Sequence, residues 1–303
     1  MPSGRFAPSP TGDLHLGNLR TALVAWLRAR TTGGTFAVRM EDLDTATARR
    51  DLGARQLDQL RAIGVDWDGP IVWQSDRRHA YDAAIASLVE AGLTYPCYCS
   101  RREIREAAAA PHGALPGGAY PGTCRSLTPG QRAERQAAGR PPALRLRAEG
   151  AVVTFDDLVV GTVTGAVDDL VLRRNDGTPA YNLAVVVDDA WQAIDEVVRG
   201  DDLLDSTPRQ VHLAGLLGLH VPRYAHVPLV LGPTGARLAK RDGAVTLDDL
   251  AMQGQDADAV RTRLAVSLGL ARPGEVPTTA DLLERFDLAQ VPRSAWTVAA
   301  ADL

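Results

Sequence analysis

The spacing of apolar residues near the N-terminus alternates between that of a strand and that of a helix. Residues 4–8 predict a short strand that runs into a proline- and glycine-rich turn at residues 8–12. Residues 35–40 predict another strand, and helices are expected from residue 52 to residue 64 and over residues 77–91. This alternation predicts a parallel sheet with helices on its faces. The first helix has apolar residues three or four positions apart, as on one helix face, at Leu19, Ala22, Leu23, Trp26 and Leu27.

The pattern changes at residue 96. Residues 96–150 hold the cysteines, a glycine- and proline-rich loop at residues 111–122 and an arginine-rich helix. Short β signals follow at residues 152–155, 159–160 and 170–172, and Asn175-Asp176-Gly177 predicts a hairpin turn. The continuous apolar run at residues 183–187 predicts a strand that is buried on both faces.

The last third of the chain predicts one more strand and a helical tail. Ser206-Thr207-Pro208 predicts a helix start, because a hydroxyl can cap the helix and proline fits its first turn. Residues 227–231 predict a strand, and the pattern is helical from Thr246. Core residues of the tail are expected at Leu264, Leu268, Leu282, Leu283 and Phe286. The predicted fold class is α/β, with a Rossmann-type doubly wound parallel sheet, an α+β insertion near residues 96–180 and a small C-terminal helical lobe.

Composition narrows the class of protein. With 303 residues, 45% of them hydrophobic and 23% charged, the chain fits a globular protein large enough for more than one core. No run of about 18 apolar residues occurs, so no membrane span is expected. The N-terminus lacks the apolar core of a secretory signal, and three cysteines argue against a disulfide framework, so the expected location is the cytoplasm. The net charge of −4 argues against a generic nucleic-acid binder but leaves room for a local arginine-rich face.

The segment His15-Leu16-Gly17-Asn18 lies where the first strand and turn lead into the first helix. A helix N-terminus presents free backbone N–H groups and a positive dipole end to an anion. Gly17 has no side chain, so a nucleotide can approach the backbone closely, and His15 and Asn18 can donate hydrogen bonds to phosphate oxygens. The alternative is a histidine in a helix-entry turn with no such function.

Lys240 is the single lysine of the chain, and all other residues in the count of 33 lysines and arginines are arginine. Lysine carries a compact, strongly hydrated charge on a flexible stem, whereas arginine is a planar fork. A lysine at this one position therefore favours a point charge on a phosphate-binding loop. The alternative is a surface lysine without a function.

All three cysteines, Cys97, Cys99 and Cys124, lie in the predicted insertion. Clustered thiols in a cytosolic protein favour zinc over disulfides, and tetrahedral zinc takes four ligands. Tyr120, His112 or water can supply the fourth ligand. The alternative is a set of buried structural thiols without a metal.

Several segments together resemble the catalytic core of class I glutamyl-tRNA synthetases, in order and spacing, over about residues 1–300. The two ends of the match correspond to the two ATP signatures of that class, the HIGH motif at His15 to Asn18 and the KMSKS motif at Arg237 to Arg241. The chain departs from the second signature, with Arg237 at its first lysine and Ala239 at its serine. The segments that carry the resemblance are residues 5–12, 15–18, 39–44, 64–68, 181–189, 198–204 and 237–241.

The resemblance implies roles for individual residues. The two arginines suit bidentate capture of a carboxylate, Glu41 can hold the α-ammonium group, and Tyr181 and Ser9 offer hydroxyls. Mg²⁺ is expected with ATP, and the implied zinc is structural. The implied glutamate site is Arg5, Phe6, Ala7, Pro8, Ser9, Glu41, Tyr181 and Arg199. The implied ATP site is His15, Gly17, Asn18, Arg237 and Lys240, of which His15, Asn18 and Lys240 are catalytic. The implied zinc ligands are Cys97, Cys99, Tyr120 and Cys124.

The chain stops at Leu303, where an anticodon-binding domain follows in glutamyl-tRNA synthetases. This short, zinc-bearing form looks like the glutamyl-queuosine tRNA(Asp) synthetases. The resemblance implies an ATP-dependent ligase that forms glutamyl-adenylate from L-glutamate and transfers glutamate to the queuosine base in the anticodon loop of tRNA(Asp). Two alternatives are a truncated glutamyl-tRNA synthetase that charges the tRNA 3′ end and a catalytically inactive tRNA-binding paralogue.

The expected partners are ATP, L-glutamate and queuosine-containing tRNA(Asp), with no membrane and a monomeric state. The implied division is 1–95 for the first half of a nucleotide-binding catalytic domain, 96–180 for an acceptor-type insertion with the zinc site, 181–243 for the second catalytic half, and 244–303 for a helical lobe like a stem-contact region.

Overall fold

The computed structural model of the chain describes residues 1–108, 119–236, 238 and 245–298. The helices are α1 (Leu16–Thr31), α2 (Arg50–Ala62), α3 (Arg78–Glu90), α4 (Arg101–Ala108), α5 (Pro129–Ala137), α6 (Tyr181–Trp191), α7 (Thr207–Leu216), α8 (Leu247–Met252), α9 (Ala257–Ser267) and α10 (Thr279–Arg285). The strands are β1 (Gly4–Phe6), β2 (Phe36–Met40), β3 (Val72–Trp73), β4 (Thr94–Cys97), β5 (Ala143–Leu146), β6 (Val152–Asp157), β7 (Gly161–Ala166), β8 (Val171–Arg173), β9 (Glu196–Gly200), β10 (Arg223–Val227), β11 (Val230–Leu231) and β12 (Trp296–Thr297).

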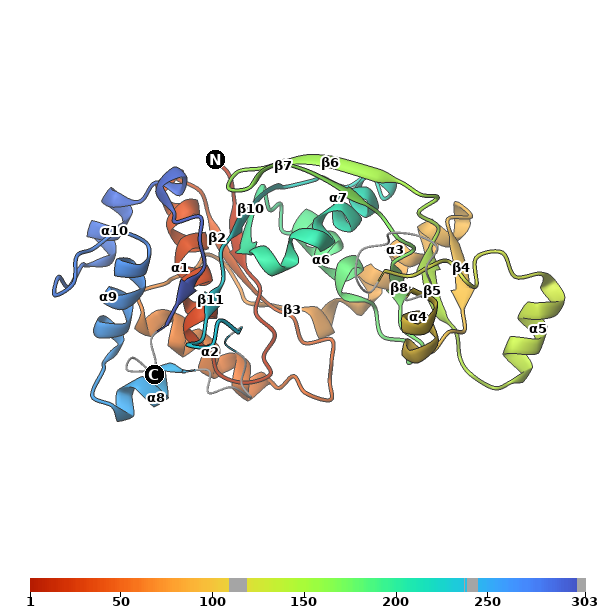
Figure 1. The fold of residues 1–303 in the computed structure, drawn as a ribbon, viewed down its shortest axis with the longest axis horizontal. Coiled ribbons are helices and arrows are strands. Elements are labelled where there is room, and N and C mark those ends of the chain that lie inside the picture. The colour runs from red at the N-terminus through yellow and green to blue at the C-terminus, as the bar shows by residue number, and fades with distance from the viewer. Residues whose placement is uncertain (109–118, 237, 239–244, 299–303) are drawn as a thin grey trace.

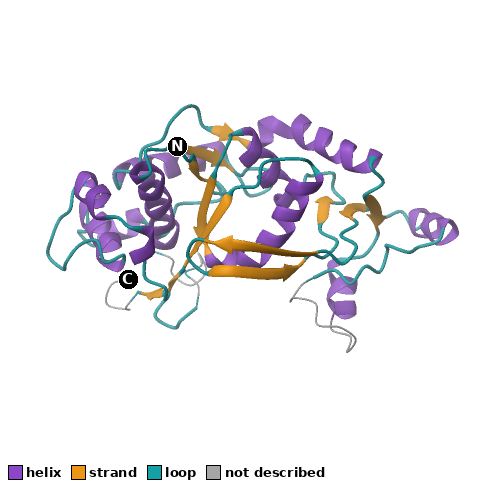
Figure 2. Cartoon of the chain, turned by 90° about the horizontal axis from the view of Figure 1, so that it is seen from above, coloured by secondary structure: helices purple, strands orange, loops and turns teal. Residues whose placement is uncertain are grey.

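The molecule is elongated, with α8, α9 and α10 at one end and α5 at the other (Figure 1). Figure 2 shows the same layout from above, with helices on either side of the central strands. No helix in the described part of the chain has both the length and the apolar character needed to cross a membrane.

Parallel strands form the centre of the fold, as the sequence predicts. One sheet has the order β1-β2-β3, and a second has the order β7-β6-β10-β9. The backbone carbonyl of Ser3 accepts hydrogen bonds from the N–H groups of Asp195 and Glu196, which joins the start of β1 to the start of β9. The second sheet is mixed, because β6 and β7 form an antiparallel hairpin while β10 runs parallel to both β6 and β9. The fold class is therefore α/β with mixed sheets.

The first hydrophobic core surrounds α1. The apolar residues predicted on one face of this helix are all buried, and α1 packs against β1, β9 and β11. The C-terminal helices close the same core, where Leu264, Leu268 and Leu282 are buried and Leu283 is partly buried. Arg20 of α1 ties the two parts together, because its guanidinium donates to the carbonyl of Pro228 at 3.0 Å and to the Ser267 hydroxyl at 3.1 Å.

The second hydrophobic core joins residues that lie far apart along the chain. It contains buried residues of α3, α6, α7 and β8. The strands β4, β5 and β8 form a small antiparallel sheet beside it. The predicted turn at Asn175-Asp176-Gly177 is present, and Gly177 adopts a φ of 83°, a conformation that glycine tolerates well.

Three predicted strands are wrong or shifted. Residues 183–187 lie inside helix α6, whose neighbours α3 and α7 bury Leu183, Ala184, Val185 and Val186. A short apolar run with burial on most sides does not by itself distinguish a helix from a strand. Residues 159–160 form the turn between β6 and β7, and the predicted strand at 227–231 is divided between the ends of β10 and β11.

Candidate active site

A cavity of about 360 Å³ lies where α1 begins beside β1 and β9. It brings together nine residues that the sequence analysis assigned to the glutamate and ATP sites: Arg5, Phe6, Ala7, His15, Gly17, Asn18, Glu41, Tyr181 and Arg199. The remaining predicted residues are placed differently. Ser9 lines a neighbouring cavity, the carbonyl of Pro8 accepts a hydrogen bond from the Glu41 N–H at 2.9 Å, and Arg237, Lys240 and His112 lie outside the described residues.

The start of α1 is built by a reciprocal cap. The Nδ1 atom of His15 accepts hydrogen bonds from the N–H groups of Gly17 at 3.1 Å and Asn18 at 3.3 Å. The Oδ1 atom of Asn18 accepts in return from the N–H of His15 at 3.3 Å. Because Nδ1 is an acceptor, the proton of the neutral imidazole lies on Nε2, and that atom is the donor that the ring can offer a ligand. The predicted helix start therefore has a defined histidine tautomer.

Gly17 sits in a confined position. A Cβ atom at this residue would lie 2.9 Å from Cε1 and 3.0 Å from Nδ1 of His15, and 3.6 Å from Cβ of Val230. The missing side chain thus gives the His15 ring its place and keeps the helix start open to the cavity.

Two described residues border the segment that contains Lys240. Leu238 lines the cavity, and the carbonyl of Val245 accepts a hydrogen bond from the N–H of Leu16 at 3.1 Å. Thr246 pairs with His15 across an isolated antiparallel bridge. The described residues on either side of segment 239–244 therefore lie beside the start of α1.

A network of buried charged side chains supports Arg5 and Glu41, which line the cavity. Arg39 is fully buried on β2 and donates to Asp189 at 2.7 Å and to Glu41 at 3.4 Å. Asp189 also accepts from the Nε of Arg5 at 3.3 Å. Burial opposes ionisation of Asp189, but the two arginines outweigh it and lower the pKa of this carboxyl group. Asp189 is thus a carboxylate that Arg5 and Arg39 share.

Glu41 differs from Asp189 in its electrostatics. Its burial raises the pKa of the carboxyl group, and Arg39 and Arg5 offset only part of this effect. Arg39 and Arg5 therefore do not fully offset the cost of burying an ionised Glu41. A ligand ammonium group would offset the rest of that cost, because an opposite charge within a few ångströms favours the carboxylate.

A second cavity of about 670 Å³ adjoins the first at Glu41 and Tyr181, which line both. Tyr181 is the first residue of α6, and its side chain is 40% exposed. The second cavity extends to the cysteines of the insertion and is lined by four arginines, Arg101, Arg140, Arg145 and Arg174. A cavity lined by several arginines suits an anionic ligand such as nucleic acid.

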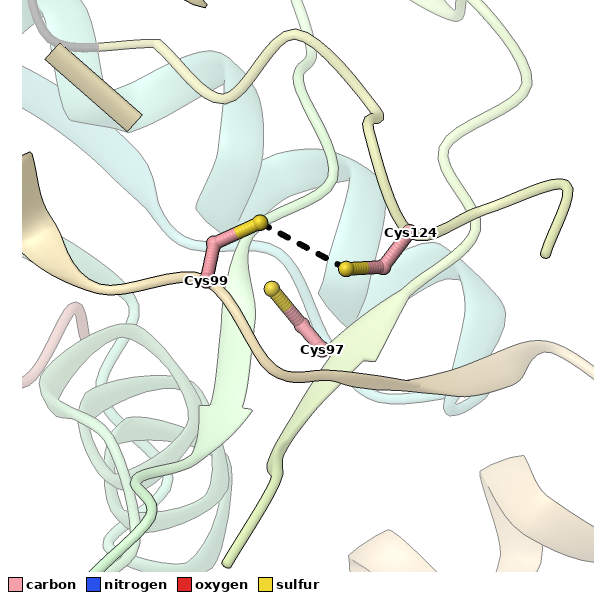
Figure 3. A group of neighbouring side chains, drawn as sticks. All are labelled: Cys97, Cys99 and Cys124. Atoms are coloured by element: carbon pink, nitrogen blue, oxygen red, sulfur yellow. Dashed lines mark hydrogen bonds between the residues drawn. The ribbon is translucent and has the colours of Figure 1, made fainter. Parts of the chain in front are cut away.

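The three cysteine sulfurs converge beside the second cavity (Figure 3). They lie within 4.8 Å of one another, and the Sγ atoms of Cys99 and Cys124 are 3.4 Å apart. Tyr120 lies beside the cysteines, since its Oη atom is 3.4 Å from the sulfur of Cys97 and 3.7 Å from that of Cys99. Tyr120 Oη accepts the N–H of Cys124 at 2.7 Å. Three sulfurs and one oxygen at these separations fit a small tetrahedral ion.

Electrostatics within this cluster favours one thiolate. The interaction with Cys97 lowers the pKa of Cys124, and the same interaction raises the pKa of Cys97. The cluster could hold a metal, and the structure brings together all four residues that the sequence analysis assigned to it.

Sequence reasoning missed the residues that support the site from behind. Arg39 and Asp189 were noted only as parts of motifs, and the strand predicted at 183–187 gave no reason to place Asp189 near Arg5. The buried charges were the available signal, because arginine and aspartate inside apolar segments need partners.

The amino-acid sequence matches known proteins along almost its whole length. The family of tRNA synthetases class I (E and Q), catalytic domain, matches residues 3–303. A glutamyl-Q tRNA(Asp) synthetase from Nocardia farcinica is 62% identical over 97% of this chain and 92% of its own. Another from Symbiobacterium thermophilum is 48% identical over 97% of this chain and 94% of its own. A glutamate–tRNA ligase from Pelobacter propionicus is 41% identical over 96% of this chain, which spans 62% of the ligase.

The fold also has a solved relative. The crystal structure of a glutamate tRNA ligase from Elizabethkingia meningosepticum, in complex with its amino acid, matches with a TM-score of 0.82 and 28% identity. The match covers 99% of this chain and 67% of that ligase.

Proposed function

The chain belongs to the class I tRNA synthetases for glutamate and glutamine, and we propose that it activates L-glutamate with ATP and transfers it to queuosine in the anticodon loop of tRNA(Asp). The observation that carries this proposal is the 62% identity to the glutamyl-Q tRNA(Asp) synthetase of Nocardia farcinica over 97% of the chain. The identity to the glutamate–tRNA ligase of Pelobacter propionicus is 41%. The protein is accordingly an ATP-dependent ligase.

The smaller cavity takes glutamate. Arg5 and Arg199 each present a guanidinium that can bind one carboxylate of the substrate, and Glu41 holds the α-ammonium group. The raised pKa of Glu41 supports this assignment, because a nearby ammonium group favours the ionised form of a buried carboxyl group. Residues 6–9 shape the wall beside the substrate, and Tyr181 offers its phenol where the two cavities meet.

Activation joins glutamate to AMP. An oxygen of the α-carboxylate attacks the α-phosphorus of ATP, a new C–O–P linkage forms, and the bond to the β-phosphate breaks to release pyrophosphate. The side chains of His15 and Asn18 contribute N–H donors at the start of α1, and Arg237 and Lys240 complete the phosphate contacts. The enzyme holds the two reactants in line and stabilises charge on the phosphate oxygens. Mg²⁺ accompanies ATP and neutralises the phosphate charge when it is bound.

The larger cavity takes the RNA. A hydroxyl of the queuosine base attacks the activated carbonyl and loses its proton to the solvent, and AMP leaves with the electron pair of the broken C–O bond. The arginines that line this cavity suit the RNA backbone, and Tyr181 and Glu41 lie at the passage between the two substrates.

The cysteine cluster takes a structural Zn²⁺ ion. Cys97, Cys99 and Cys124 supply thiolates, and Tyr120 supplies its phenol oxygen. The buried positions of Cys97, Tyr120 and Cys124, the half-buried position of Cys99 and the N–H of Cys124 that points at Tyr120 Oη support this set. Zinc joins the end of β4 to the loop around Cys124 and so stiffens the wall of the larger cavity. A cytoplasmic location, a monomeric state and the division at residues 95, 180 and 243 stay predictions.

Transfer of labelled glutamate tests the function directly. The protein is incubated with ATP, labelled glutamate and total tRNA, and the tRNA is then cut. Label on the anticodon-loop fragment of tRNA(Asp) is the expected result, and tRNA without queuosine is the control that should stay unlabelled. Label on the terminal adenosine would instead favour charging of the tRNA 3′ end, as the name of the Pelobacter relative, glutamate–tRNA ligase, suggests. A failure of glutamate to support ATP–pyrophosphate exchange would point to an inactive paralogue.

A further inference from the structure

Arg199 is buried without a carboxylate partner among the described residues. Its exposed fraction is 5%, and its three hydrogen bonds go to neutral groups. Nε donates to Nε2 of His226 at 3.0 Å, Nη1 donates to Gln210 at 2.8 Å, and Nη2 donates to Thr207 at 2.8 Å. Arg5 and Arg39, by contrast, share Asp189. A buried charge without an opposite charge is unfavourable, so Arg199 retains its full attraction for an incoming anion.

The contact with His226 requires one tautomer of the histidine. A guanidinium can only donate, so Nε2 of His226 accepts and carries no proton. The Nδ1 atom lies 2.6 Å from Oδ2 of Asp157 and therefore carries the proton of the neutral ring. With the opposite tautomer, or with a doubly protonated ring, an N–H group would face the guanidinium of Arg199.

Asp157 is fixed where β6 ends. Its Oδ1 accepts the N–H groups of Val159 and Val160, each at 2.9 Å, and the N–H of His226 donates to its Oδ2 at 3.1 Å. Burial opposes ionisation of Asp157, but these hydrogen bonds outweigh it and lower its pKa. For His226, burial lowers the pKa of the ring, in agreement with a neutral imidazole. Both side chains are 0% exposed.

We infer that His226, held in the Nδ1–H tautomer by Asp157, is a positioning residue that aims Arg199 at a carboxylate of the substrate. Asp157 belongs to the β6–β7 hairpin of the insertion, and His226 belongs to β10. The insertion thus supports the glutamate site through a chain of two hydrogen bonds. This inference rests on the proposed function, because glutamate is the anion that Arg199 receives.

Four variants test the inference by their KM for glutamate in ATP–pyrophosphate exchange. His226→Leu removes the acceptor, and Asp157→Asn presents an amide N–H to Nδ1 and reverses the tautomer at almost constant volume. We expect both to raise KM for glutamate about tenfold or more, with little change in KM for ATP, since a hydrogen bond to a charged group is lost. His226→Gln keeps an acceptor near Nε2 and should raise KM less than His226→Leu. His220→Phe is the matched control, because the His220 side chain is 57% exposed.

A spectroscopic measurement on the wild-type protein needs no variant. Nitrogen-15 NMR of the His226 ring should show the proton on Nδ1, whether or not glutamate is the true substrate. A proton on Nε2 would overturn the inference, as would a KM for glutamate in Asp157→Asn equal to that of wild type. Absence of glutamate-dependent exchange in the wild type would instead defeat the proposed function, and the NMR result would still decide the tautomer.

Discussion

Gly17→Ala should separate stability from activity at the start of α1. A Cβ atom at residue 17 would lie 2.9 Å from Cε1 of His15, whereas non-bonded carbons prefer about 3.5–4.0 Å. The imidazole has to move, because the opposing atoms belong to a side chain while the helix backbone is fixed. Once it moves, Nδ1 no longer accepts the N–H groups of residues 17 and 18, and Nε2 no longer points where the geometry places it.

The two effects on stability have opposite signs. Loss of a helix N-cap costs about 1 kcal/mol, whereas alanine in place of a helical glycine gains about 0.5–1 kcal/mol. The free energy of unfolding should therefore change by less than about 1 kcal/mol in either direction. The effect on catalysis has one sign only, because loss of a preorganised donor at a developing charge costs about 2.7–4 kcal/mol of the barrier. We expect glutamate-dependent ATP–pyrophosphate exchange to fall at least about a hundredfold.

Gly215→Ala in α7 is the matched control. A Cβ atom at this helical glycine meets nothing within 4 Å. This variant should gain stability by about 0.5–1 kcal/mol and exchange at the wild-type rate. Denaturant unfolding measures the first quantity, and exchange with labelled pyrophosphate measures the second. If Gly17→Ala exchanged as fast as Gly215→Ala, the argument that Gly17 holds His15 in place for ATP would fail.

Three further predictions concern the other groups of the site. Lys240→Ala should keep the wild-type Tm and lower pyrophosphate exchange at least about a hundredfold; exchange near the wild-type rate would remove Lys240 from the ATP site. Glu41→Gln should lose glutamate binding in calorimetry. Because the pKa of Glu41 is raised, its protonated form stabilises the folded protein at low pH, and this stability is lost once the buried carboxyl group ionises. The Tm of Glu41→Gln should therefore rise relative to that of the wild type as pH increases. A Tm difference that is the same at pH 4 and pH 8 would contradict this sign. Cys124→Ser should lower the zinc content and the Tm together, and wild-type protein with less than about half an equivalent of zinc would refute the metal site.

The sequence predicts the parts of this fold whose signal is local. The spacing of apolar residues places α1, which packs against β1 and β9 and is also covered by α9 and α10. The helix start at His15 and the cysteine cluster are likewise compact in sequence. His226 and Asp157 could not be found in this way, since they are 69 residues apart and meet only because β10 runs beside β6. Neither residue belongs to a motif that the sequence analysis singled out.

The site requires residues 183–187 to form a helix instead of the predicted strand. Tyr181 and Asp189 are eight positions apart, and in a strand they would be separated by about 26 Å. In a helix the rise of about 1.5 Å per residue reduces the distance to about 12 Å, with both residues turned toward a similar side. Tyr181 can then line the cavity while Asp189 reaches Arg5 and Arg39 behind it. The segment 181–189 therefore forms one site only as a helix, and its burial between α3 and α7 is what gives it the uninterrupted apolar run of a strand.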